Sequence, residues 1–413
     1  MRRFDGLRSL GLLCRSAAVA AAATAVGWTA VQGLREPAAA LAFGLLMVLG
    51  EAVRTELPGG RDVAPLGAAA AFGYALLGET GGSPAAPGAA QVVAVCAAAL
   101  LLGAVPAVLA GAAPSVEHAC RRLLTVGFAA VCFQPLHGSG LVGPGQAVPA
   151  MLVVLLATGL FGAVLGAGLD TPGSGLPYGV LLREELRGRR GLGAAVCATA
   201  AVMASAVAVA GLWALPVFCV PLLPTQLALR RYAASQAVYR QTIASLARAT
   251  EVAGHTVAGH SHRVAALSRE VGRRLGLRES ELLVLEYAAL MHDIGQLSLL
   301  DPVPGGATEP LDPRVRRRIA ALGGAVVRQS GVPEEVALIV EQQAGRYRDQ
   351  PVAARVVRAV NAYEELAGGS GGRADPVGGP LGALERLRLA TAHELDPRVV
   401  EALACAVSRG AVR

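Results

Sequence analysis

The stretch GHSHRVAALSREVGRRLGLRESELLVLEYAALMHDIGQ, Gly259 to Gln296, decides how the second half of this chain is interpreted. Apolar residues recur at intervals of three and four on both sides of Gly276, which predicts two amphipathic helices joined by a turn. His260 lies at the start of the first helix, and the adjacent pair His292 and Asp293 closes the second. Imidazole nitrogens and carboxylate oxygens on converging helices are typical ligands of divalent metals. The stretch therefore predicts part of a metal site.

The same helical spacing continues to the end of the chain. It recurs in 336–340, 356–366 and 399–407, and no stretch in this half shows the sustained two-residue alternation that is typical of a strand. Segments rich in proline or glycine at 302–313 and 368–379 predict loops. We therefore expect an all-helical C-terminal half.

The first half of the chain has a different composition. Of the 413 residues, 54% are hydrophobic and only 16% are charged, and the mean hydropathy is +0.50. Residues 16 to about 229 contain long uncharged runs, whereas 230–413 carry most of the charge, so we expect a membrane half joined to a soluble half. All 37 basic residues are arginine, which together with the high alanine and glycine content suggests a GC-rich bacterial genome.

The uncharged runs predict the transmembrane helices. A crossing needs about twenty residues, so the final run of 191–229 is long enough for two, and Trp213 and Pro216 near its middle predict a hairpin. We expect about eight membrane helices, and six to eight remain compatible with the pattern because two of the runs are short. The other runs lie at 16–34, 37–50, 63–79, 91–116, 123–136 and 147–169.

The arginines between these runs predict the topology. If the N-terminus lies inside, the inner segments carry clusters of arginine and the outer loops carry only Arg35. This pattern predicts a multi-pass protein of the bacterial inner (cytoplasmic) membrane, with the N-terminus and the C-terminal domain in the cytoplasm. Because the arginines set topology, the net charge of +7 does not indicate a nucleic acid polymer as a partner. The expected spans contain no charge that would mark an ion path, so a sensory or anchoring bundle is preferred to a transporter.

These patterns divide the all-α chain into three predicted parts. Residues 1–229 form a multi-pass membrane domain, 230–254 a helical linker, and 255–413 a soluble domain. The linker has apolar residues at Val238 and Ile243 among polar ones, which predicts a continuous helix leaving the membrane. Such a helix could pair with its twin in a homodimer.

Several segments of the second half, in order, resemble the HD superfamily of metal-dependent phosphohydrolases, and most closely its HD-GYP branch. GHSHRVA and AALMHDIGQ are similar to the segments that carry the first histidine and the His-Asp doublet. DPVPGGATEPLDPRVRRRI, ARVVRAVNAYEEL and HELDPRVVEAL are similar to the branch's loop, its later helix and its closing segment. The resemblance covers roughly residues 235–410 and implies an all-helical HD-type domain. In that branch, two or three metal ions activate the water that hydrolyses cyclic di-GMP.

The resemblance implies roles for particular residues of this chain. His292 and Asp293 are the catalytic candidates if the domain is active, and Asn361 stands where the family has an aspartate. Arg263 and Gln296 fall at positions expected to face the substrate phosphate, where Gln296 replaces a lysine. The implied metal is divalent (iron, manganese or nickel), and its implied ligands are His260, His292, Asp293 and Asn361.

Other family positions are degenerate in this sequence. Three histidine ligands are replaced by Leu322, Gln342 and Gln343, and GRYRDQP stands in place of the GYP stretch. Leucine cannot bind a metal, and an amide oxygen replaces an imidazole poorly. A centre of two or three metals is therefore not expected. A domain that has kept these residues for structure alone, without any metal, is the preferred interpretation, and a reduced one-metal site is the alternative.

Two functions follow from this pattern. The first is a membrane-anchored bacterial signalling protein whose degenerate HD-GYP-type domain is catalytically impaired and regulatory, and binds a cyclic dinucleotide or a signalling protein. The alternative is an active metal-dependent HD phosphohydrolase that acts on cyclic di-GMP or a related nucleotide with a reduced one-metal site. If a cyclic dinucleotide binds uncut, Arg263, Arg346 and Arg348 are candidates for its phosphates.

Overall fold

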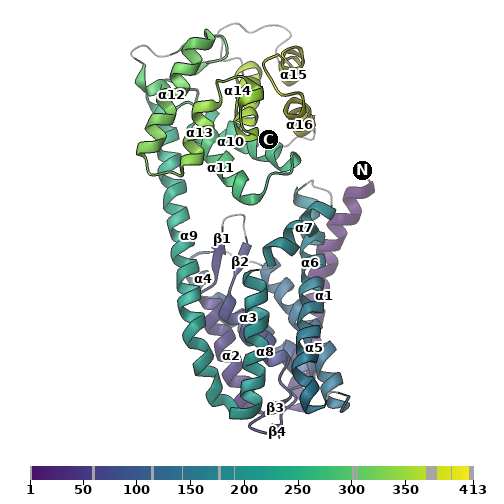
Figure 1. The fold of residues 1–413 in the computed structure, drawn as a ribbon. Coiled ribbons are helices and arrows are strands. Elements are labelled where there is room, and N and C mark those ends of the chain that lie inside the picture. Colours follow the sequence, from purple (N-terminus) through teal and green to yellow (C-terminus); the bar gives the residue numbers. More distant parts are fainter. Residues whose placement is uncertain are drawn as a thin grey trace. The chain divides into compact units, whose positions relative to one another are not determined.

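The computed structural model describes residues 2–57, 61–112, 116–141, 143–174, 178–189, 191–299, 303, 306–368, 379–391 and 393–408 (Figure 1). The chain divides into two compact units, Met1–Ala233 and Ala234–Arg413. Helices dominate both units, as the sequence predicts for an all-α protein.

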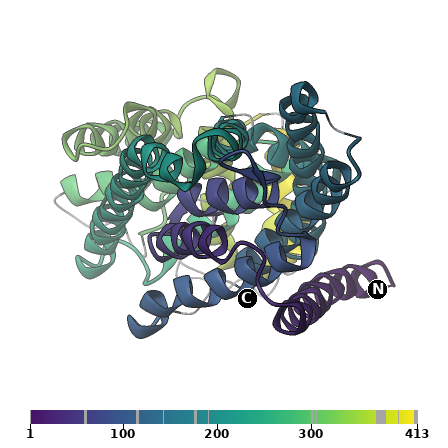
Figure 2. The ribbon, with the colours of Figure 1, turned by 90° about the horizontal axis from the view of Figure 1, so that it is seen from below.

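The first unit is a bundle of helices. Figure 2 shows α1 at the edge of this bundle, where its contacts are with α4, α5 and α6. Prolines occupy the first helical position of α2 and α3, where a missing backbone N–H costs nothing. The helices are α1 (Arg2–Gln32), α2 (Pro37–Ala52), α3 (Pro65–Ala75), α4 (Ala89–Leu109), α5 (Val116–Gly138), α6 (Ala147–Ser174), α7 (Tyr178–Arg189) and α8 (Leu192–Ala210), followed by α9 (Ala214–Val252).

Two short antiparallel hairpins interrupt these helices. β1 (Thr55–Leu57) pairs with β2 (Arg61–Val63), and β3 (Glu79–Thr80) pairs with β4 (Ser83–Pro84). Strands of two or three residues are too short to produce an alternating pattern, so the sequence did not predict them. The segment between the expected spans 147–169 and 191–229, which is rich in arginine and expected as an inner loop, contains the helix α7.

Four stretches of the described chain are long and apolar enough to cross a membrane. They are Gly11–Gln32, Ala89–Leu109, Ala147–Leu169 and Leu192–Val252. The last one contains α8 and α9, and the short 3₁₀ helix η2 (Gly211–Trp213) separates them near the expected hairpin.

The outward surface of these helices is apolar. The residues Leu109, Leu156 and Val209 are 83%, 77% and 85% exposed, and such apolar surface is unfavourable in water and favourable in lipid. These features indicate membrane association. The expected shorter spans fall in α2, α3 and α5, so the count of eight crossings stays a prediction.

A buried charged group lies inside the first unit, which the sequence analysis missed. Glu51, just after the expected span 37–50, is buried, with Oε2 3.0 Å from His118 Nε2 and Oε1 3.5 Å from Arg122 Nη2. Glycine makes room for it, because a Cβ on Gly103 would lie 2.6 Å from the Cβ of Glu51. Apart from Glu79 at the end of 63–79, the expected spans are uncharged, but a paired carboxylate is buried just after one of them.

The second unit is also helical. Its 3₁₀ turns are η3 (Ile294–Ser298) and η5 (Tyr347–Asp349). Its core contains the apolar faces predicted from sequence, including Val264, Leu285, Val340, Val357 and Leu403, all fully buried. Its helices after α9 are α10 (His260–Arg274), α11 (Glu279–Met291), α12 (Pro313–Gln329), α13 (Glu334–Gln342), α14 (Val352–Ala367), α15 (Pro380–Leu389) and α16 (Pro397–Ser408).

Glycine and capping residues fix the helices that carry the site. A Cβ on Gly295 would lie 2.0 Å from the carbonyl oxygen of Ile319, so α12 packs directly against the turn that follows α11. Asp312 caps α12 by accepting a hydrogen bond from the Arg314 amide at 2.7 Å. The expected loop at 302–313 is described only in part, and most of the glycine run at 368–379 lies outside the described residues.

Candidate metal site and the pocket beside it

The start of α10 brings His260 into the centre of the second unit. Gly259 precedes it with a φ of +75°, a conformation that glycine adopts without strain. The Gly259 amide donates to Glu251 Oε1 at 3.0 Å, so the acidic residue of the preceding helix holds this turn. His292 and Asp293 follow the last residue of α11 directly and, like His260, are buried.

Four ligand atoms from α10, α14 and the end of α11 converge. His260 Nε2 lies 2.9 Å and His292 Nε2 3.0 Å from Asn361 Oδ1. Asp293 Oδ2 lies 3.1 Å from His292 Nε2 and 3.6 Å from His260 Nε2. Ligands about 2.1 Å from one cation lie about 3.0 to 3.5 Å from each other, so these spacings suit a shared metal ion. His260, His292 and Asp293 form the group in the described chain that could hold one.

The hydrogen bond of the other His292 nitrogen supports this interpretation. Nδ1 lies 2.7 Å from the Ala289 carbonyl oxygen, which can only accept, so Nδ1 carries a proton. A neutral His292 then presents the lone pair of Nε2 to the centre, as a metal ligand must. Asp293 Oδ2 is buried, and the nearest cationic group that the described residues offer it is His292, with Nε2 at 3.1 Å. A cation would satisfy both atoms, so the donor set fits a divalent metal.

The amide of Asn361 has a fixed orientation. Its nitrogen donates to Glu365 Oε1 at 2.8 Å and to Thr308 Oγ1 at 3.3 Å, which leaves Oδ1 facing the two histidines. Glu365 also accepts hydrogen bonds from the Thr308 and Glu309 amides, both at 2.9 Å. Asn361 therefore offers the site a neutral oxygen that a buried carboxylate on its own helix holds in place.

The charges of the metal-free site are those of one ion pair. Burial alone would lower the pKa of His292, but the charge of Asp293, together with the hydrogen bonds that His292 makes with Asp293, Ala289 and Asn361, raises that pKa to about 9. Burial would raise the pKa of Asp293, but the charges of His292 and His260 lower it. Burial, followed by the charge of His292, lowers the pKa of His260. A metal ion would therefore replace the proton on His292.

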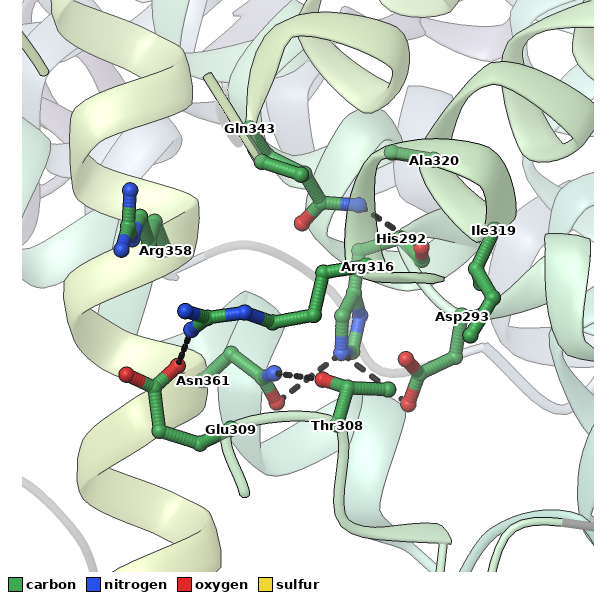
Figure 3. Close-up of a pocket in the computed structure, with 11 residues that line it drawn as sticks. His292, Asp293, Thr308, Glu309, Arg316, Ile319, Ala320, Gln343, Arg358 and Asn361 are labelled. Atoms are coloured by element: carbon green, nitrogen blue, oxygen red, sulfur yellow. Dashed lines mark hydrogen bonds and ion pairs between the residues drawn. The ribbon is translucent and has the colours of Figure 1, made fainter. Parts of the chain in front are cut away.

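A small pocket opens beside these groups (Figure 3). Arg316 of α12 and Arg358 of α14 line it, and Glu309 lies next to Arg316 with Oε2 2.8 Å from Arg316 Nη1. The other lining residues are His292, Asp293, Thr308, Ile319, Ala320, Gln343, Ala344 and Asn361. The pocket thus joins the candidate metal ligands to two cationic side chains.

Comparison with known proteins identifies the second unit. Residues 257–366 match the family described as the HD domain. This chain carries an HD domain. A 73-residue segment is also 36% identical to the cyclic di-GMP phosphodiesterase response regulator RpfG of Xanthomonas campestris pv. campestris (strain 8004). That match covers 17% of this chain and 19% of RpfG, so the chain spans about a fifth of the length of the curated relative that it matches. No solved structure matches the chain.

The expected phosphate contacts of the HD domain lie away from the pocket. Arg263 Nε is 3.0 Å from Glu364 Oε2, so this arginine is held in an ion pair. Gln296 is fully buried and donates to the Gly306 carbonyl oxygen at 3.2 Å. Arg346 and Arg348 are exposed. None of these four residues lines the pocket.

The degenerate positions of the HD domain lie around the site without completing a second one. Leu322 is half-buried and Gln342 exposed, and neither lines the pocket. Gln343 does line it, but its amide nitrogen donates to the His292 carbonyl oxygen at 2.8 Å. The neighbouring Ala344 has no ligand atom. His262 and His393 are exposed and His255 is half-buried, and none of the three lines the pocket.

Sequence reasoning missed the residues that shape the HD domain's pocket from the later helices. Glu365, Arg316 and Arg358 occupy positions for which the resemblance implied no role. A helical periodicity gives one signal, because Arg358 and Asn361 are three residues apart and share a face of α14. For Arg316 and Thr308 the sequence offered no such signal.

Proposed function

We propose that this protein is a membrane-anchored signalling protein whose HD domain binds a nucleotide phosphate ester beside a single divalent metal and is catalytically impaired. The convergence of His260, His292 and Asp293 on the oxygen of Asn361 carries the proposal. HD domains are generally metal-dependent, which agrees with this donor set. The likeness to RpfG favours a cyclic dinucleotide, with cyclic di-GMP as the first ligand to test.

The chain's own residues would hold and orient the metal. His260 and His292 supply imidazole nitrogens, Asp293 the one full negative charge, and Asn361 a neutral oxygen. The Ala289 carbonyl fixes the His292 tautomer, and Glu365 fixes the Asn361 amide. When bound, a divalent cation supplies Lewis acidity and lowers the pKa of a bound water.

Two features favour impairment over full activity. A neutral amide replaces a carboxylate at Asn361, which lowers the negative charge available to hold a cation. Around the pocket, Gln343 and Ala344 offer no imidazole or carboxylate for a second metal. A two-metal site stabilises both the attacking and the leaving oxygen of a phosphodiester, and a one-metal site gives up part of that stabilisation.

Metal analysis of the purified full-length chain tests the proposal. We expect about one iron or manganese ion per chain, lost in Asp293→Ala and retained in His262→Ala, a matched control at an exposed histidine. We expect cyclic di-GMP to bind in equilibrium dialysis and to be recovered intact. A protein that stays metal-free after reconstitution with both metals would overturn the one-metal centre.

The alternative function is an active HD phosphohydrolase that acts on cyclic di-GMP or a related nucleotide with this reduced site. The approach of Asp293 Oδ2 to the Nε2 atoms of both histidines, at 3.1 and 3.6 Å, favours it, because this cluster suits a working ligand set better than a purely structural one. Release of a linear dinucleotide by the metal-loaded protein, abolished in Asp293→Ala, would establish this alternative and overturn the regulatory function.

A further inference from the structure

Arg316 and Arg358 bring two half-buried guanidinium groups to the pocket beside the candidate metal ligands (Figure 3). Their side chains are only 14% and 12% exposed. A cation loses hydration when it is buried, so two cations that line one pocket need anions close by. The guanidinium group also presents a planar fork of N–H donors that matches carboxylate and phosphate oxygens.

The anions that the chain itself supplies neutralise these arginines only in part. Arg316 has Glu309, at 2.8 Å. Arg358 donates to the Gly345 carbonyl oxygen at 2.8 Å, and its other nitrogen lies 3.2 Å from Glu394, whose side chain is 54% exposed and screened by water. Burial lowers the pKa of Arg358, Glu309 opposes that effect, and the charge of Arg316 adds to it. The positive charge of Arg316 and Arg358 is therefore not fully balanced, and another anion beside them would be electrostatically favourable.

Glu309 can leave Arg316 without moving its backbone. The Glu309 amide donates to Glu365 Oε2 at 2.9 Å, and the amide and hydroxyl of Thr308 both donate to Glu365 Oε1 at 2.9 Å. These bonds hold the main chain while the Glu309 side chain, 30% exposed, keeps access to water. An entering anion could displace this carboxylate by rotation about side-chain bonds alone.

We propose that Arg316 and Arg358 form the binding site for the phosphate group of the nucleotide ester, and that Glu309 occupies it as an internal competitor. This proposal rests on the proposed function, which places the phosphate beside the candidate metal ligands. It adds the two arginines that bind the phosphate and the glutamate that competes with it. A carboxylate presents two oxygens to a guanidinium fork, as a phosphate does, so Glu309 is a chemical stand-in for the ligand. Arg263, Arg346 and Arg348 take no part.

Equilibrium dialysis with radiolabelled inorganic phosphate tests the site on the full-length chain in nanodiscs. A chelator is present throughout, so binding to a metal does not contribute. We expect Arg316→Gln and Arg358→Gln each to weaken phosphate binding about tenfold or more, since a charged hydrogen bond is worth about one decade in affinity or more. Arg317→Gln, an exposed arginine on the same helix, is the matched control and should leave the affinity unchanged.

Removal of the competing charge should have the opposite effect. Glu309→Gln should tighten phosphate binding about tenfold, and this gain should vanish when it is combined with Arg316→Gln, because the two groups compete for one position. If Arg316→Gln fails to fold, as judged by circular dichroism, Arg316→Lys retains the charge and should bind phosphate more weakly than the wild type but measurably.

The outcomes separate this proposal from the proposed function. Equal phosphate affinities in Arg316→Gln and Arg317→Gln, or no phosphate binding even in Glu309→Gln, would overturn the anion site, whatever the metal content. A chain that binds phosphate as expected but never holds a metal would keep the anion site and overturn the one-metal centre.

Discussion

At the scale of single residues, Asn361 and Glu365 act as a pair. The amide nitrogen of Asn361 lies 2.8 Å from a Glu365 oxygen, and burial together with the charge of Asp293 raises the pKa of Glu365. An aspartate at position 361 would put an oxygen where that nitrogen now donates. Two carboxylates at this distance cannot both stay ionised. The neutral amide of Asn361 therefore suits the neighbouring Glu365 carboxylate, with which it forms a hydrogen bond that an aspartate could not form.

This pairing predicts that the family aspartate cannot be restored alone. Asn361→Asp should destabilise the HD domain by roughly 1 to 3 kcal/mol and gain little metal affinity, because one carboxylate must bind a proton. Asn361→Asp combined with Glu365→Gln should recover stability and bind manganese about tenfold more tightly than the wild type. Chelator competition measures the affinity, and Glu365→Gln alone is the control. A single Asn361→Asp variant that binds metal as tightly as the double variant would contradict this account.

The sequence pointed to the candidate metal ligands, but it did not predict most of the residues that line the pocket beside them. His260, His292 and Asp293 lie close to helix ends in a recognisable order, so a resemblance could identify them. Arg316 faces the pocket only because α12 packs onto the turn at Gly295, a long-range contact that no local pattern encodes. Side-chain direction at such a position follows from packing and not from periodicity.

At the scale of elements, helix termini set the position of the ligands. α11 ends one residue before His292, so any shift of this helix moves the His-Asp doublet. Its start is fixed by Arg278 and Glu281, whose side chains pair at 2.9 Å, while Glu281 also accepts from the Arg278 amide at 2.8 Å. The helix α11, which the apolar pattern from 282 to 290 predicted, is therefore stabilised at its first turn by the contacts between Arg278 and Glu281.

The Glu281 cap predicts a pH-dependent stability. The hydrogen bonds from Arg278 lower the pKa of Glu281. A lowered carboxyl pKa contributes stability above the unfolded value of 4.5, and this contribution is lost as the pH falls through the folded value. Glu281→Gln should therefore cost about 0.5 to 1 kcal/mol at pH 7 and less at pH 3. Amide exchange of α11, corrected for the intrinsic rate at each pH, measures this difference, and an equal loss at both values would contradict it.

At the scale of the whole molecule, helical periodicity and composition predicted the class of both halves. Uncharged runs identified the apolar helices, because a helix that crosses lipid needs about twenty consecutive apolar residues, and such a run can be found in the sequence directly. Pairing of Glu51 with His118 and Arg122 was not predicted, since it depends on how α2 and α5 pack together. The number of membrane crossings depends on the thickness of the membrane and on where it lies along the helices. The lengths of the apolar runs alone do not determine either of these.

The arginine pattern makes the last prediction, which concerns the two ends of the chain. The segments expected inside carry arginine clusters and the loops expected outside carry only Arg35, so both termini should lie in the cytoplasm, where the HD domain would meet a nucleotide. A green fluorescent protein fused after Arg413 should fluoresce, and alkaline phosphatase at the same position should be inactive. Phosphatase inserted beside Arg35, in the first loop expected outside, should be active and serves as the control. Active phosphatase after Arg413 would place the HD domain outside the cytoplasm and remove its access to an intracellular signalling nucleotide.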